Sequence, residues 1–252
     1  YQFSISSVHN FLPMPVEVQT DSPDCYEFTS LRASDRDRAT KLSRITIDWA
    51  AELGVPFVVV HTGRIRELKL TAPLQKMVTD GKFLSRAFVK KRLDAIQARE
   101  KVSEKYNRLV LGCLSELAAY AGKKGVRLGI ENREHYEAAP LEREMVAFFQ
   151  SLNSPHVGYW HDFGHAQIKH NLGFFDHFQW LEKMSPLLIG CHIHDTRWPF
   201  RDHCPPFSGD TPLEKLVPLL PKKCATVFEM SPRTEAADIQ KAATAWKQLF
   251  KR

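Results

Sequence analysis

Short apolar runs rich in β-branched residues recur along the chain, separated by longer segments in which apolar residues repeat every three or four positions. The short runs predict β-strands, and the longer segments predict helices that bury one face. Six runs have the length and composition of strands: 1–8, 55–60, 126–130, 157–160, 187–191 and 225–228. Strands that alternate with helices in this order are typical of a parallel sheet joined by helical crossovers.

The helical segments differ in length. Residues 36–53 predict a helix whose apolar face is formed by Leu42, Ile45, Trp49 and Leu53. Residues 87–121 carry a sustained apolar repeat, which predicts one long amphipathic helix. Shorter helices are predicted over 141–152, 174–184, 212–219 and 234–250.

Every predicted strand runs directly into a residue that can bind a metal ion. These residues are His9, His61, Glu131, Asp162, His192 and Glu229. Because the carboxyl ends of parallel strands meet on one face of a barrel, the six side chains are expected to converge. A single histidine or acid at a strand end is usually structural, but six in succession favour a metal site. Imidazole nitrogen together with carboxylate oxygen suits zinc, manganese, iron or cobalt.

Further polar side chains cluster beside these positions. They are His161, His165, His194, Asp195, Asp202 and His203. Imidazoles that bind metal usually give their second nitrogen to a carboxylate or carbonyl oxygen. We therefore expect some of these residues to support the ligands instead of binding metal.

Composition narrows the class of protein without identifying it. The 252 residues, of which 43% are hydrophobic, can bury one sizeable core, so we expect a single domain over 1–252. The net charge of +6 is modest and does not separate a small-molecule enzyme from a nucleic-acid enzyme. Five cysteines without CxxC spacing favour a reducing compartment. No apolar run approaches the roughly 20 residues that cross a bilayer, so a soluble, cytoplasmic protein is expected.

Together, the motifs at the strand ends resemble the xylose isomerase-like barrel superfamily, which includes sugar isomerases and epimerases as well as endonuclease IV. The motifs span nearly the whole chain: Ser7-Val8-His9-Asn10, Val60-His61-Thr62-Gly63, Ile130-Glu131-Asn132, His161-Asp162-Phe163-Gly164-His165, Cys191-His192-Ile193-His194-Asp195 and Phe228-Glu229. The resemblance implies an α/β fold, a (β/α)8 TIM barrel, with its first two βα units before Tyr1. The sequence would then be N-terminally incomplete. An open six-stranded sheet leaves two edges, so we expect them to be covered either by the missing residues or by a partner, for example a second copy of the chain.

The resemblance also implies roles for individual residues. The four-residue metal shell of the epimerases corresponds to Glu131, Asp162, His192 and Glu229. Additional ligands of endonuclease IV-like members correspond to His9, His61 and His165. One divalent ion (Mn, Zn, Co or Mg) is implied, or up to three if these histidines also bind metal. Arg201 stands where those members have the first Asp of an Asp-x-His element, which argues against the full three-metal site.

The leading hypothesis is a divalent-metal-dependent isomerase or epimerase that acts on a sugar or sugar phosphate. The ion would polarise the substrate carbonyl, and Glu131 and Glu229 would remove and return the neighbouring proton. Several residues expected near or after the strand ends are candidates for substrate binding: Arg64, Arg133, His165, Lys169, His194, Trp198, His203 and Phe207. A lyase or dehydratase that uses the same metal chemistry stays open.

Two alternatives belong to other classes of protein. A zinc phosphodiesterase resembling endonuclease IV would use clustered ions to activate water against a DNA backbone. His9, His61 and His165 favour it, whereas the modest positive charge and Arg201 argue against it. A barrel retained only for binding would predict loss of metal ligands, but all four residues of the central shell are present.

Overall fold

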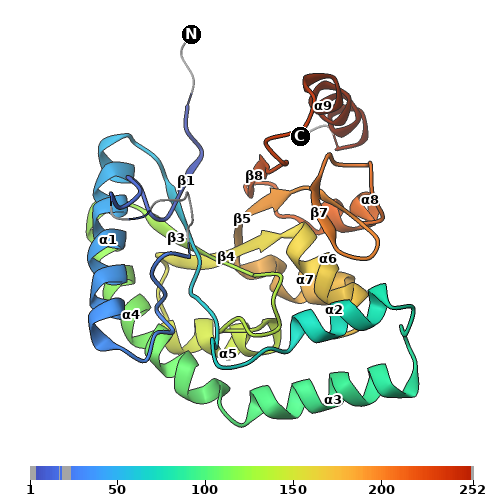
Figure 1. Ribbon diagram of the computed structural model, residues 1–252. Helices are drawn as coiled ribbons and strands as arrows, with labels where there is room; N and C mark the ends of the chain where they lie inside the picture. Colours follow the sequence, from blue (N-terminus) through green and yellow to red (C-terminus); the bar gives the residue numbers. More distant parts are fainter. Residues whose placement is uncertain (1–3, 17, 19–23, 251–252) are drawn as a thin grey trace. The chain divides into compact units, whose positions relative to one another are not determined.

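The computed structural model describes residues 4–16, 18 and 24–250, in which strands and helices alternate along the chain (Figure 1). The strands are β1 (Ser7–His9), β2 (Phe57–Val60), β3 (Arg127–Glu131), β4 (Val157–Asp162), β5 (Leu188–Ile193), β6 (Asp195–Arg197), β7 (Arg201–Cys204) and β8 (Ala225–Phe228). The α-helices are α1 (Ala33–Glu52), α2 (Thr71–Thr79), α3 (Arg86–Glu100), α4 (Ser103–Lys124), α5 (Glu142–Leu152), α6 (Phe163–Asn171), α7 (His177–Met184), α8 (Leu213–Leu216) and α9 (Ala236–Phe250). Short 3-10 helices cover Ser185–Leu187 and Val217–Leu219. No helix within the described residues has the length and apolarity needed to cross a membrane.

The chain forms two compact units. The first unit comprises residues 1–69, 93–131 and 137–159, and the second comprises residues 70–92, 132–136 and 160–252. Strand β4 and helix α3 each contribute residues to both units.

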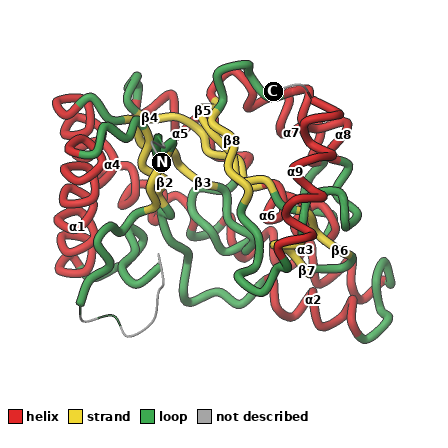
Figure 2. Tube along the Cα trace, turned by 90° about the horizontal axis from the view of Figure 1, so that it is seen from above, coloured by secondary structure: helices red, strands yellow, loops and turns green. Residues whose placement is uncertain are grey.

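In the first unit, β1, β2 and β3 run parallel in that order. The register places His9 beside Val59 and Val60 beside Ile130. Helices α1 and α4 pack against each other and lie side by side in both views (Figures 1 and 2). The parallel register brings the carboxyl ends of all three strands to one edge, where their polar end residues gather.

In the second unit, β5 and β8 pair in parallel over Gly190–Ile193 and Ala225–Phe228, and β6 and β7 form an antiparallel pair. Every residue of β5 is buried, and so is every residue of β4. A parallel strand covered on both faces reads as a continuous apolar run, which is why the sequence reveals these strands clearly.

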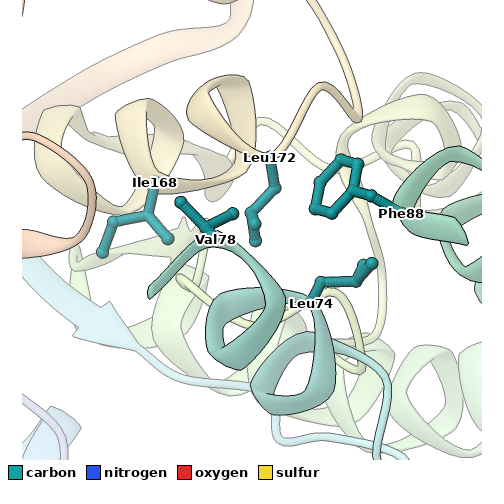
Figure 3. Close-up of a cluster of buried hydrophobic side chains, with 5 residues drawn as sticks. All are labelled: Leu74, Val78, Phe88, Ile168 and Leu172. Atoms are coloured by element: carbon teal, nitrogen blue, oxygen red, sulfur yellow. The ribbon is translucent and has the colours of Figure 1, made fainter. Parts of the chain in front are cut away.

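A separate hydrophobic cluster holds the second unit's helices together. Leu74 and Val78 of α2, Phe88 of α3, and Ile168 and Leu172 of α6 point toward one another (Figure 3). The i, i+4 spacing of Leu74 with Val78, and of Ile168 with Leu172, puts each pair on one face of its helix. Strand β4 leads directly into α6, so this cluster anchors the helix that follows it.

All six predicted strands are present, and five of them (β2, β3, β4, β5 and β8) run to or past the end of their predicted ranges. The first prediction is only partly confirmed. The strand occupies Ser7–His9, residues 4–6 lie outside it, and residues 1–3 fall outside the described residues.

The single helix predicted over 87–121 is wrong, because the segment forms α3 and α4 with a break at residues 101–102. Val102 packs against a buried cluster of Ile65, Tyr106 and Ala139. This tertiary contact turns the chain where the apolar repeat alone indicates a continuous helix.

Three elements escape the sequence prediction: α2, α6 and the β6–β7 pair. Helix α6 is buried at eight of its nine positions, so it lacks the alternation of polar and apolar residues that marks a surface helix. The helix predicted over 174–184 begins later, at His177.

The predicted apolar face of α1 is also corrected. Leu42 is buried, but Ile45, Trp49 and Leu53 are 37%, 44% and 50% exposed. The face that packs inward is formed mainly by small residues: Ala39, Leu42, Ser43, Thr46, Ile47 and Ala50.

Candidate metal centre

Two imidazoles share one carboxylate at the strand ends of the first unit. His9 ends β1, His61 follows β2 and Glu131 ends β3. Glu131 Oε2 lies 3.1 Å from His61 Nε2 and 3.3 Å from His9 Nε2. The ligand atoms of the three side chains lie within 4.8 Å of one another, a spacing suited to one shared metal ion. We refer to these three residues as the histidine cluster.

The outer hydrogen bonds of the two imidazoles set their tautomers. His9 Nδ1 lies 2.9 Å from the carbonyl oxygen of Asn10, and His61 Nδ1 lies 2.8 Å from Asp24 Oδ1. Both partners only accept hydrogen bonds, so each Nδ1 carries the proton. Burial lowers the pKa of His9, and the neighbouring His61 lowers it further, so the His9 ring stays neutral. Its Nε2 lone pair then faces the Glu131 carboxylate, and this convergence of electron pairs fits a cation.

Asp24 is a site residue that the sequence interpretation missed. It lies on the loop of residues 24–30, which is held against the end of β2 by a hydrogen bond from Phe28 N to Thr62 O (3.1 Å). Gly63, at φ +109°, makes this packing feasible, because a Cβ there would lie 2.4 Å from Thr29 Oγ1. No motif links residue 24 to residue 61, so only the folded loop reveals the pair.

In the second unit, one imidazole lies between two carboxylates. His192 Nδ1 is 3.0 Å from Glu229 Oε2 and 3.8 Å from Asp162 Oδ2. Ligand atoms of these three residues lie within 4.8 Å of one another. We call them the carboxylate cluster. Of the four-residue shell predicted from the sequence, the second unit thus brings together Asp162, His192 and Glu229, while Glu131 belongs to the first unit.

Buried side chains hold Asp162 from several directions. Asn132 accepts a hydrogen bond from Asp162 N (2.8 Å) and donates one to Asp162 O (3.0 Å). The carboxylate of Asp162 caps α6 by accepting from His165 N (2.7 Å). His194 Nδ1 accepts from His203 N (2.8 Å), so its Nε2–H donates to Asp162 Oδ2 (3.0 Å). Both ring nitrogens of the fully buried His194 are therefore engaged, which makes it a support for Asp162.

A second acidic residue that the sequence interpretation missed is Glu134. It is paired with Arg133 (3.4 Å) and His135 (3.0 Å), and His165 Nε2 lies 3.6 Å away. Burial acts to raise the pKa of Glu134, but His165, His135 and Arg133 together hold it well below the usual value. Glu134 therefore stays ionised, and its charge faces His165.

The predicted substrate-binding residues lie in different environments. Arg64 is half exposed, and Trp198 is 49% exposed with its ring against Phe83. His203 is one-third exposed, and its hydrogen bond with Asp202 raises its pKa. The prediction that Lys169 lies in a loop is wrong, because it is buried in α6 with its ammonium over the Phe175 ring. Phe207 does lie in a loop and stacks on Phe250.

The chain has relatives among known protein families and solved structures. A family model described as "Xylose isomerase-like TIM barrel" matches residues 3–249. No curated protein matches the sequence. Many solved structures share the fold.

Among these structures is a D-tagatose 3-epimerase-like protein, at TM-score 0.66 and 19% identity, with 100% of this chain and 78% of that chain covered. Another is the apo form of 3-keto-D-glucoside 4-epimerase, YcjR, from E. coli, at TM-score 0.62 and 15% identity, covering 88% and 75%. A third is the IOLI protein with a zinc atom, at TM-score 0.63 and 17% identity, covering 89% and 73%. At these identities the likeness shows the fold, an α/β TIM barrel, as the sequence predicts.

Proposed function

The chain belongs to the xylose isomerase-like TIM barrel family, and from that premise we propose that it is a divalent-metal-dependent isomerase or epimerase of a sugar or sugar phosphate. The observation that carries the proposal is the carboxylate cluster, in which Asp162, His192 and Glu229 offer ligand atoms within 4.8 Å of one another. One imidazole with two carboxylates is a donor set that suits zinc, manganese or cobalt. Several solved structures with this fold are sugar epimerases by name, which supports the same reaction class.

Glu131 is the proposed fourth ligand. The family resemblance assigns it this role, and the next residue, Asn132, makes two hydrogen bonds to the backbone of Asp162. His194 holds the Asp162 carboxylate and Asn132 holds the Asp162 backbone, so that ligand needs little reordering when an ion binds. His9, His61 and His165 remain candidates for binding further ions.

A divalent ion at this centre would polarise the substrate carbonyl and so acidify the carbon-bound proton next to it. In the proposed reaction, Glu131 and Glu229 exchange that proton: one carboxylate removes it from one side and the other returns it. The Glu229 side chain is 39% exposed, so it can reach substrate. Glu131 is 1% exposed and faces two imidazoles, which keep its carboxylate oriented.

Elemental analysis of purified protein tests the proposal first, using wild type, Glu131→Gln and Glu229→Gln. Glu116→Gln is the control, because Glu116 is an exposed acid on α4 that pairs with Arg44 of α1. We expect one tightly held divalent ion in wild type and the control, and loss of that ion in both test variants. A screen of keto-sugars and their phosphates for isomer formation then follows. Metal-free wild-type protein after growth with zinc and manganese would overturn the proposal.

A second candidate function is a zinc phosphodiesterase, and the histidine cluster favours it because it offers ligands for a further ion. Two or three zinc ions per chain, together with nicking of supercoiled plasmid DNA, would support this candidate. Isomerisation of a sugar without nicking would exclude it.

A further inference from the structure

A pocket in the first unit begins beside the histidine cluster and takes no part in the proposed metal chemistry. Its cavity measures about 490 Å³, within the range of small-molecule sites. Two of its lining segments start at the cluster. Cys25 follows Asp24, which contacts His61, and Arg64 is the third residue after His61.

The acidic side chains of the pocket are already satisfied by neighbours within the first unit. The pairs are Glu27 with Arg66 (2.7 Å), Asp35 with Ser30 (2.9 Å) and Glu67 with Tyr106 (2.6 Å). Each carboxylate therefore accepts a hydrogen bond from a neighbouring side chain of the pocket.

Two arginines of the pocket differ in this respect. Among the described residues, the exposed Arg32 side chain makes no hydrogen bond or ion pair. Within the described part of the chain, the Arg64 side chain makes only a 4.0 Å approach from its Nε to Glu27 Oε1, although its backbone is held by a bridge to Ala138. Two guanidinium groups thus line the cavity with most of their donors available. A planar guanidinium matches the two oxygens of a carboxylate or phosphate.

We propose that this pocket binds an anionic group of the substrate, a phosphate monoester or a carboxylate. Arg32 and Arg64 supply the hydrogen bonds, and the Glu27–Arg66 ion pair forms another part of the lining. The inference rests on the proposed function and deepens it, because it assigns the enzyme to acidic sugars instead of neutral ones.

Calorimetric titration tests the inference with four probes: D-fructose, D-fructose 6-phosphate, D-fructuronate and inorganic phosphate. The proteins are wild type, Arg32→Gln, Arg64→Gln and the control Arg44→Gln, in which the lost cation pairs with Glu116 outside the pocket. We expect wild type to bind at least one acidic sugar about tenfold or more tightly than it binds fructose. Each pocket variant should bind that acidic sugar roughly tenfold more weakly than wild type does, and the control should bind it as wild type does. Whether the phosphate or the carboxylate binds tighter identifies the anion. Higher salt should weaken the tighter binding of the acidic sugar.

Equal affinity for fructose and both acidic sugars would overturn the inference, and so would tighter binding that neither pocket variant changes. If no sugar binds but inorganic phosphate binds in an Arg32- and Arg64-dependent way, the pocket assignment stands while the proposed function fails. If wild type converts fructose and binds no anion, the proposed function stands and the pocket assignment fails.

Discussion

The histidine cluster and the carboxylate cluster occupy equivalent places, at the carboxyl ends of parallel strands, yet they are supported differently. In the first unit, the outer partner of His61 is Asp24, whose side chain is 40% exposed on a surface loop. In the second unit, the partners of Asp162 are Asn132 and His194, which are 2% and 0% exposed. Asp162 is therefore held by the core of the second unit, whereas His61 in the first unit depends on a loop.

This difference bears on which cluster is pre-organised for metal. Ligands held by buried hydrogen bonds need little rearrangement when an ion binds, whereas ligands ordered by a loop lose entropy if that loop is disturbed. We expect the carboxylate cluster to tolerate changes at the surface and the histidine cluster to respond to them.

The largest effect is expected from His194→Ala. The substitution removes a buried ring that bonds both Asp162 and the backbone of His203, and it leaves a cavity. It should lower the free energy of unfolding by about 3 kcal/mol and weaken metal binding by roughly 10–100-fold. Urea unfolding and zinc titration measure the two quantities. His194→Gln keeps a donor and should lose less; equal stability of His194→Ala and wild type would remove the distinction drawn between the clusters.

Gly63→Ala should act next most strongly, and on the loop of the histidine cluster. The new Cβ would lie 2.4 Å from Thr29 Oγ1 and 2.7 Å from Glu27 Cβ at a positive φ, so the loop of residues 24–30 must shift. We expect a loss of about 2 kcal/mol in unfolding free energy. Gly54→Ala is the matched control, because its φ is also positive, +67°, but nothing lies within 4 Å of the added Cβ. Equal losses in the two variants would mean that the loop packing contributes nothing.

Asp24→Asn should barely change stability, by less than about 1 kcal/mol, because the Asp24 side chain is partly exposed. Loss of the carboxylate charge beside His61 Nδ1 should nevertheless weaken one zinc site by roughly 10–100-fold, because the ring becomes a less basic ligand. Competition with a chromophoric chelator measures the affinity. Asp202→Asn, which changes the partner of His203, is the control. Unchanged zinc affinity in Asp24→Asn would remove the histidine cluster from metal binding.

The smallest effect concerns pH and Glu27, on the same loop as Asp24. Burial raises the pKa of Glu27 despite its ion pair with Arg66. The folded state therefore holds the Glu27 proton more tightly than the unfolded chain does. Its contribution to stability is full below the usual Glu pKa of 4.5 and is lost as pH rises through the raised pKa. Glu27→Gln should remove that part of the pH slope in urea unfolding.

Asp48 provides the opposite case in the same unit. Its hydrogen bond with Lys124 lowers the pKa of Asp48. The contribution of Asp48 to stability is therefore present above the usual Asp pKa of 3.8 and is lost as pH falls through the lowered pKa. Asp48→Asn should therefore flatten the acid side of the profile only. If the unfolding free energy of Glu27→Gln depended on pH in the same way as that of wild type, burial would not raise the pKa of Glu27.

Strand positions were the most predictable feature of the fold, and helix boundaries the least. Val58, Val59 and Val60 form a run that a buried parallel strand requires, and the metal-binding residue follows at once. Helix α6 escaped prediction because burial on all sides erases helical periodicity. The break between α3 and α4 escaped because it depends on Val102 packing against a cluster that includes Ile65 and Ala139, which are distant from it in sequence.

The sequence by itself determined which chemical groups stand at the strand ends, since strand periodicity and polar terminators are local properties. His9, His61 and Glu131, as well as Asp162, His192 and Glu229, follow from that local pattern. Only the tertiary structure decided which residues support each ligand: Asp24 bonds His61, and Asn132 and His194 bond Asp162. It also decided how the charged side chains around Arg64 are paired. These contacts join residues far apart along the chain, and a hydrogen bond depends on distance and direction in space, which no spacing of residues encodes.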